Sequence, residues 1–169
     1  MTVTCPIDTM PLSPEQLCLR LTREGENTLA FFSDLPEEIH HTRIYTEGDH
    51  WSIGHILRHL VQAEKAIQRL MASILGGGAG TPEDFDLDAY NERKVREIES
   101  LELADLLADF AATRARTVAW VSERTSDDLA LIGRHPFLGF APIEEMVKLL
   151  YRHTQLHQRD IRRSLNGEA

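Results

Sequence analysis

Apolar residues recur every three or four positions in four long segments of this chain, and this periodicity constrains the fold more than any other feature. Side chains at that spacing line one face of an α-helix. Segments of roughly 22–25 residues would form helices about 35 Å long, and such helices must bury their apolar faces against one another. We therefore predict an all-α fold, a four-helix bundle. No segment has a convincing strand pattern, so we predict no β-strand.

Local signals delimit the four helices. Ser13 and Ser52 can each cap the start of a helix, and three consecutive glycines, residues 76–78, stop the second one. Pro142 suits the first position of the fourth helix, and Gly167 suits its end. The predicted helices span about 13–34, 52–75, 100–125 and 142–166.

The connection between the second and third helices, residues 76–98, is long. A connection of this length lets the chain cross the bundle instead of turning straight back, and residues 90–99 are predicted to be partly helical. Residues 126–141 are predicted to form a loop. The whole chain, residues 1–169, suits a single domain whose core spans about 13–166.

Charge and composition exclude several classes of function. The formal net charge is −9, which disfavours a nucleic-acid partner because phosphate binding needs a basic surface. The two cysteines, Cys5 and Cys18, form no CxxC motif, as expected in a reducing compartment. Residues 1–10 lack the features of a signal peptide, and no apolar run is long enough to span a membrane. We expect a soluble cytoplasmic protein without a membrane partner.

Two of the 8 histidines, His153 and His157, are four residues apart in the fourth predicted helix. Four residues rise about 6 Å and return nearly to the same face, so two such imidazoles can bind one metal ion. On a helical wheel His157 falls inside the apolar face and His153 at its border. A third ligand must come from another helix, and His59 is the best candidate because His55 falls nearer the opposite face.

Spacing alone leaves two interpretations of these histidines open. Chance gives about 0.4 HxxxH pairs in a chain with 8 histidines in 169 positions, and His55–His59 is a second such pair. The rings are either ordinary core or solvated side chains, or ligands of zinc, nickel or ferrous iron, which all accept neutral imidazole. Three protein ligands would leave positions open for water or substrate, as a catalytic metal requires.

Several short motifs together resemble the DinB/YfiT-like superfamily. Each is short, but their order and spacing cover nearly the whole chain, from about Ser13 to Asn166. The motifs are WSIGHILRHL at residues 51–60, FDLDAYN at residues 85–91, GRHPFLG at residues 133–139 and HTQLH at residues 153–157.

This resemblance implies a four-helix bundle with a non-sequential crossover, often dimeric and bacterial, with a divalent metal ion on His59, His153 and His157. The superfamily includes transferases and isomerases that use bacillithiol, mycothiol or glutathione. We therefore expect a metal-dependent enzyme, either a thiol-dependent S-transferase or a hydrolase, with a small-molecule substrate and unassigned catalytic residues. The alternative is a non-catalytic, metal-stabilised dimeric bundle that binds a ligand or a partner.

Two further polar residues each have a structural and a functional interpretation. His135 precedes a proline, and turning or capping the loop is the favoured role over contact with a substrate. Asp160 lies one turn beyond His157 and can orient that ring through its outer nitrogen. Pairing of Asp160 with Arg159 or Arg163 is the favoured role.

Overall fold

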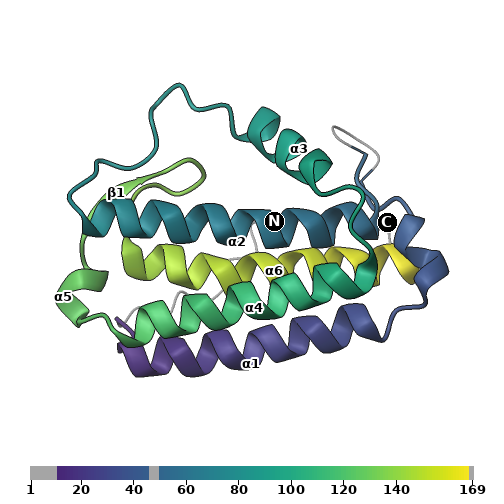
Figure 1. Cartoon of the computed structure of the whole chain (residues 1–169), viewed down its shortest axis with the longest axis horizontal. Coiled ribbons are helices and arrows are strands. Elements are labelled where there is room, and N and C mark those ends of the chain that lie inside the picture. The colour runs from purple at the N-terminus through teal and green to yellow at the C-terminus, as the bar shows by residue number, and fades with distance from the viewer. Residues whose placement is uncertain (1–10, 46–49, 168–169) are drawn as a thin grey trace.

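Four long helices make up most of the computed structural model, which describes residues 11–45 and 50–167 (Figure 1). Residues 1–10, which include Cys5 and are expected to hold no signal peptide, lie outside the described residues. The first long helix packs against the third and fourth, and the second packs against the same two, which closes a four-helix bundle. The predicted fold class is confirmed. The four helices are α1 (Pro14–Ser33), α2 (Ile53–Leu75), α4 (Leu103–Ser122) and α6 (Ile143–Leu165).

The predicted long crossover between α2 and α4 is also confirmed. In Figure 1 these two helices run in the same direction, so the chain must return along the length of the bundle between them. It does so on the outer side of α2, where a shorter helix packs. The shorter elements are η1 (Glu37–His41), α3 (Leu87–Glu97), α5 (Ser126–Leu129), β1 (Ile132–His135) and β2 (Gly139–Pro142).

Side-chain caps fix the starts of α1 and α2 where the sequence predicts them. The Ser13 hydroxyl accepts the backbone N–H of Gln16, and the Ser52 hydroxyl accepts that of His55. The third long helix begins at Leu103, later than predicted. The guanidinium of Arg58 donates to the carbonyl oxygens of residues 98, 99 and 101, which holds this stretch as a turn.

The prediction of no β-strand was wrong, because residues 132–142 form an antiparallel hairpin. Its inward-facing positions include Gly133, His135 and Ala141. These residues are small or polar, so they do not give the large apolar side chains at alternate positions that predict a strand. A Cβ at Gly133 would overlap the side chain of Ile74, so this glycine lets β1 lie against the end of α2. Pro142 ends β2 in extended backbone and stands at the N-cap position of α6, without a side-chain cap, instead of taking the first helical position.

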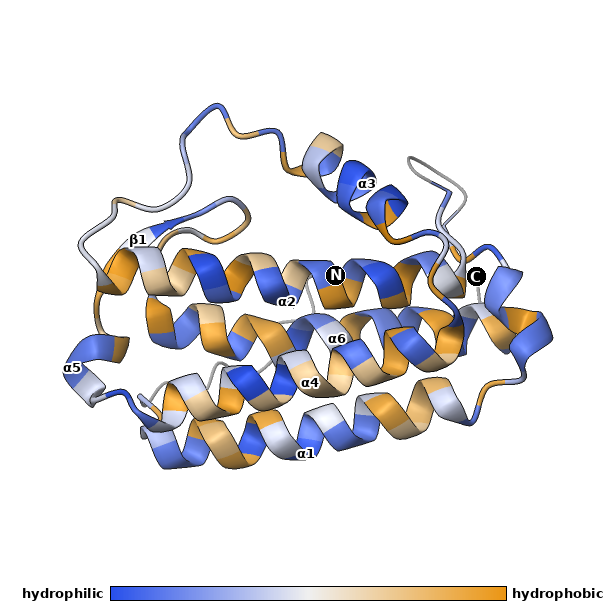
Figure 2. Cartoon of the chain, viewed as in Figure 1, coloured by the Kyte–Doolittle hydropathy of each residue, from blue (hydrophilic) through white to orange (hydrophobic). Residues whose placement is uncertain are grey.

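The core consists of two apolar clusters along the bundle, separated by buried polar side chains. One cluster includes Leu21, and the other includes Phe32. Figure 2 shows apolar residues interleaved with hydrophilic ones on all four long helices. We call the intervening side chains the polar layer, and they come from all four helices. Its buried members are Thr28, Glu64, Thr113, Arg114, Thr117, Thr154 and Gln158. In the described part of the chain, no helix is long and apolar enough to cross a membrane.

Candidate metal centre

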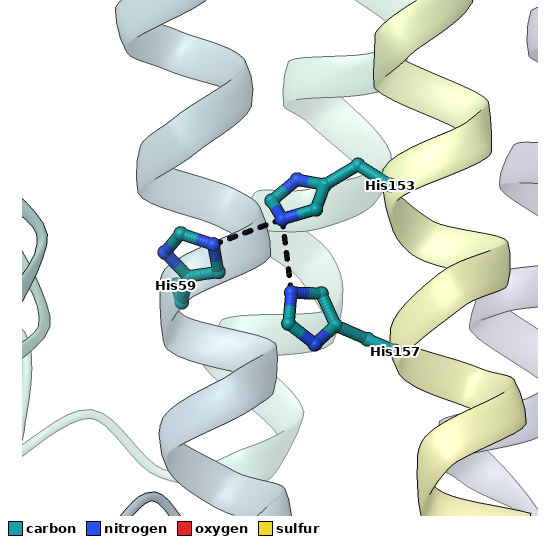
Figure 3. Close-up of side chains that lie close together, drawn as sticks. All are labelled: His59, His153 and His157. Carbon is teal, nitrogen blue, oxygen red and sulfur yellow. Dashed lines mark hydrogen bonds between the residues drawn. The ribbon is translucent and has the colours of Figure 1, made fainter. Parts of the chain in front are cut away.

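Three histidines from α2 and α6 point toward one another in the space between these helices (Figure 3). The Nε2 atom of His153 lies 3.1 Å from Nε2 of His59 and 2.9 Å from Nε2 of His157. The potential ligand nitrogens of all three rings lie within 4.8 Å of one another. The structure thus brings together the three residues selected from the sequence, and their role as metal ligands stays a prediction.

Burial keeps these imidazoles in the neutral form. His59 and His157 are buried, and His153 is partly exposed. Burial lowers the pKa of His59 well below its usual range and the pKa of His157 to about 4. Burial, with the neighbouring imidazoles, lowers the pKa of His153 to about 3. Neutral imidazole is the form that binds metals, so at pH 7 no imidazolium must first lose its proton.

Two of the three separations between these nitrogens, those that involve His153, match ligands of a single divalent cation. Metal–nitrogen bonds of about 2.1 Å place ligand nitrogens about 3.4 Å apart in a tetrahedral site and about 3.0 Å apart in an octahedral one. The Nε2 atom of His153 lies 2.9 and 3.1 Å from those of the other two rings, close to this range. The whole set of ligand nitrogens lies within 4.8 Å. Within residues 11–45 and 50–167, this is the one cluster of three or more His, Cys, Asp or Glu residues that could hold a metal ion.

A family model described as the DinB superfamily matches residues 20–161. The chain belongs to the DinB superfamily. This match confirms the resemblance that the short motifs indicated. No curated protein matches the chain.

Solved structures share the fold of this DinB superfamily member. YfiT from Bacillus subtilis, described as a probable metal-dependent hydrolase with an unusual four-helix bundle topology, is 18% identical with a TM-score of 0.71. The alignment covers 98% of this chain and 95% of YfiT. A mycothiol-dependent maleylpyruvate isomerase is 16% identical with a TM-score of 0.71. The alignment covers 88% of this chain and only 60% of the isomerase.

A third structure is the colibactin self-resistance protein ClbS, solved in complex with double-stranded DNA. It is 14% identical with a TM-score of 0.69, and the alignment covers 92% of this chain and 98% of ClbS. At these identities the likeness shows a common fold. The expectation that our DinB superfamily member binds no nucleic acid stays a prediction.

Two aromatic side chains near the start of α2 contact the histidines. The ring of Trp51 packs against the ring of His59, with centroids 4.7 Å apart and planes tilted by 45°. The backbone carbonyl of Trp51 accepts the N–H groups of Ile44 and Tyr45. These hydrogen bonds join the segment that ends at Tyr45 to the residue just before α2. Trp51 therefore covers one face of a candidate ligand.

Tyr45 reaches a second histidine and was not predicted from the sequence. Its hydroxyl oxygen lies 2.7 Å from Nδ1 of His157 and donates to Oδ2 of Asp160 at 3.0 Å. Asp160 also forms its predicted ion pair with Arg159, at 3.3 Å. Tyr45 lies in an irregular segment without motif or periodicity, so no sequence signal marks it.

The other histidines considered as site residues have structural roles. His55 completes the capping box of α2, with its Nδ1 accepting the backbone N–H of Ser52 at 3.2 Å. The Nδ1 of His135 accepts the backbone N–H groups of Phe137 and Leu138, at 3.0 and 3.2 Å. This confirms the predicted role of His135 in turning the chain. Burial lowers the pKa of His135 to about 4.

Proposed function

We propose that this protein is a metal-dependent enzyme in which His59, His153 and His157 bind one divalent ion. The observation that carries the proposal is the convergence of three neutral imidazoles whose Nε2 atoms face one another between α2 and α6. Placing three polar rings together in a bundle is unfavourable unless their nitrogens find partners, and a cation provides a partner for all three at once. The description of YfiT as a probable metal-dependent hydrolase supports the same assignment.

The proposed chemistry is thiol-dependent S-transfer or hydrolysis of a small electrophilic substrate. A divalent ion held by three imidazoles keeps coordination positions open and lowers the pKa of a thiol or water bound there. The histidines contribute nitrogens without charge, so the positive charge that favours a thiolate or hydroxide is not cancelled by the ligands. His153 is the partly exposed member of the cluster, so we place the access for small molecules on its side.

Zinc, nickel and iron each suit an all-imidazole donor set, and a low-molecular-weight thiol is the proposed co-substrate. The mycothiol dependence of the isomerase with the same fold supports a thiol. We propose a cytoplasmic location, where such thiols stay reduced.

The deciding experiment measures metal binding by variants of single histidines. We expect the protein purified without chelators to contain a stoichiometric divalent metal by elemental analysis. His59→Ala, His153→Ala and His157→Ala should each weaken zinc binding strongly in a competition assay with a chromophoric chelator. His41→Ala is the matched control, because His41 is exposed and lies outside the cluster. Binding like that of the parent in all three cluster variants would refute the site.

Turnover separates the enzyme from the non-catalytic alternative. The metal-loaded protein should accelerate reaction of glutathione, bacillithiol or mycothiol with 1-chloro-2,4-dinitrobenzene, or hydrolysis of 4-nitrophenyl acetate. His153→Ala should remove that acceleration. A metal-loaded protein inactive toward all these pairs would favour the metal-stabilised bundle.

We also propose that the protein forms a homodimer through the hairpin. Three large apolar side chains of this element are exposed, with Ile132 at 66%, Phe137 at 71% and Phe140 at 76%. Apolar groups gathered on one element commonly mark a protein–protein contact. Light scattering should give twice the mass of the chain, and Phe140→Ser should shift the equilibrium to monomer. A monomeric parent at high concentration would refute this contact.

A further inference from the structure

A hydrogen-bonded chain connects the outer nitrogen of one candidate ligand to a carboxylate. The hydroxyl of Tyr45 lies between Nδ1 of His157, at 2.7 Å, and Oδ2 of Asp160, at 3.0 Å. Both distances are those of good hydrogen bonds. Tyr45 comes from the connection before α2, whereas the other two residues lie on α6. A side chain from a different part of the fold therefore spans one turn of α6.

The direction of these hydrogen bonds follows from the number of protons. A tyrosine hydroxyl carries one hydrogen, and a carboxylate can only accept. Because Tyr45 donates to Asp160, it can meet His157 only as an acceptor, so Nδ1 of His157 must carry the ring proton. The reverse arrangement would leave two acceptor oxygens facing each other 3.0 Å apart without a hydrogen.

The environment keeps the Tyr45 hydroxyl protonated. Burial raises the pKa of this phenol, and the hydrogen bond to Asp160 raises it further. The hydroxyl therefore remains a neutral donor and acceptor over the ordinary pH range. In a neutral His157 ring with its proton on Nδ1, the lone pair is on Nε2, and this is the atom that lies 2.9 Å from Nε2 of His153.

We propose that Tyr45 is a positioning residue that, together with Asp160, holds His157 in its Nδ1–H tautomer and directs the Nε2 lone pair into the histidine cluster. Metal-bound histidines generally donate their outer N–H to a carboxylate, carbonyl or water, and here the tyrosine hydroxyl is interposed. The effect of this arrangement on metal binding rests on the proposed function. The tautomer itself is a property of the metal-free protein.

The first test is therefore made without metal, by long-range proton–nitrogen NMR of histidine-labelled protein. We expect the parent to show a protonated Nδ1 and a bare Nε2 at His157. Tyr45→Phe should give a mixture of tautomers because it removes the acceptor. Asp160→Ala should favour the Nε2–H form, because the Tyr45 hydroxyl is then free to donate to Nδ1. Tyr90→Phe is the matched control, since Tyr90 bonds to Arg69 instead.

The second test uses Zn²⁺ alone as the probe. Tyr45→Phe should weaken zinc binding by about 10- to 100-fold, the usual effect of losing such a partner, while Tyr90→Phe should leave it unchanged. A parent His157 in the Nε2–H form would overturn the proposal. So would a Tyr45→Phe variant with lower thermal stability but unchanged tautomer and zinc affinity, which indicates packing alone. A parent that binds no zinc would refute the metal site and leave the tautomer result standing.

Discussion

The carboxylate of Glu64 accepts two hydrogen bonds from the guanidinium of Arg114, at 2.8 and 2.9 Å, inside the bundle. Both side chains are almost fully buried, at 3% and 5% exposed. The hydroxyl of Thr117 donates to the same carboxylate at 2.7 Å, and Arg114 also donates to the carbonyl oxygen of Leu21 at 3.0 Å. These three side chains of the polar layer thus form a satisfied network that links α1, α2 and α4 between the two apolar clusters.

Removing one partner of the Glu64–Arg114 pair should lower the free energy of unfolding. Arg114→Met leaves the Glu64 carboxylate buried without its cation, and we expect a loss of about 3–5 kcal/mol in the free energy of unfolding. Replacing both partners, Glu64→Leu with Arg114→Met, removes the unpaired charge and should recover much of that loss. Urea unfolding at pH 7 measures both. A single variant as stable as the parent would contradict the role of the pair.

Gly25 lies in the middle of α1, and its replacement by alanine, which usually stabilises a helix, should destabilise this protein. Alanine at such a position normally gains about 0.5–1 kcal/mol. A Cβ at Gly25 would lie 2.8 Å from Cγ of Arg114, whose guanidinium is held by Glu64, so Gly25→Ala should instead cost about 1–3 kcal/mol by overpacking. Gly76→Ala is the control, since its Cβ would make only ordinary contacts at 3.5 Å. Equal unfolding free energies for the two variants would contradict this explanation.

Helix starts could be predicted because their signals are local, as Ser13 and Ser52 illustrate. The start of α4 could not, because it depends on Arg58, whose guanidinium binds carbonyl groups about 40 residues away in the sequence. The hairpin was missed because Gly133 and His135 face inward where a strand pattern requires apolar bulk. Tertiary contacts decide these elements, and a local pattern does not record them.

The candidate site, like the fold, could be predicted from the sequence only where local spacing decides the structure. The spacing of His153 and His157 places both on one face of a helix, and the wheel with the family resemblance selected His59 from another. Tyr45 joins them through a contact between an irregular connection and α6, more than 100 residues apart in sequence. Only the packing of the whole bundle brings that hydroxyl to the ring.

The buried imidazole of His40 should make stability fall in mild acid. The residue is 7% exposed, and among the described residues neither ring nitrogen has a partner in good hydrogen-bond geometry. Burial lowers the pKa of His40, with His41 adding to the effect and Glu37 and the nearby backbone carbonyls of Phe32 and Leu35 opposing it. The unfolded chain, with a histidine pKa of about 6.5, therefore binds more protons than the folded one as pH falls below that value.

The loss of stability caused by His40 therefore grows as pH falls from about 6.5 toward the lower pKa that His40 has in the folded protein. Between pH 7.5 and pH 5.5, the free energy of unfolding measured in urea should fall less for His40→Leu than for the parent. His50→Leu serves as the control because that ring is exposed and is not among the groups that shift the pKa of His40, so it should keep the slope of the parent. The other buried histidines contribute equally to parent and variants. If the unfolding free energy of His40→Leu changed with pH as that of the parent does, His40 would not be the cause of the loss.

The fluorescence of Trp51 should report directly on the histidine cluster. Its ring lies 4.7 Å from the ring of His59, centroid to centroid, whereas the other tryptophan, Trp120, stacks with Arg124 at the end of α4. An open-shell ion such as Ni²⁺ or Co²⁺ bound to His59 would be close enough to quench the Trp51 indole, and zinc added first should block the response. Trp120→Phe should retain this quenching, and Trp51→Phe should lose it. Quenching carried by Trp120 alone, or surviving in His153→Ala, would show that the ions bind elsewhere on the protein.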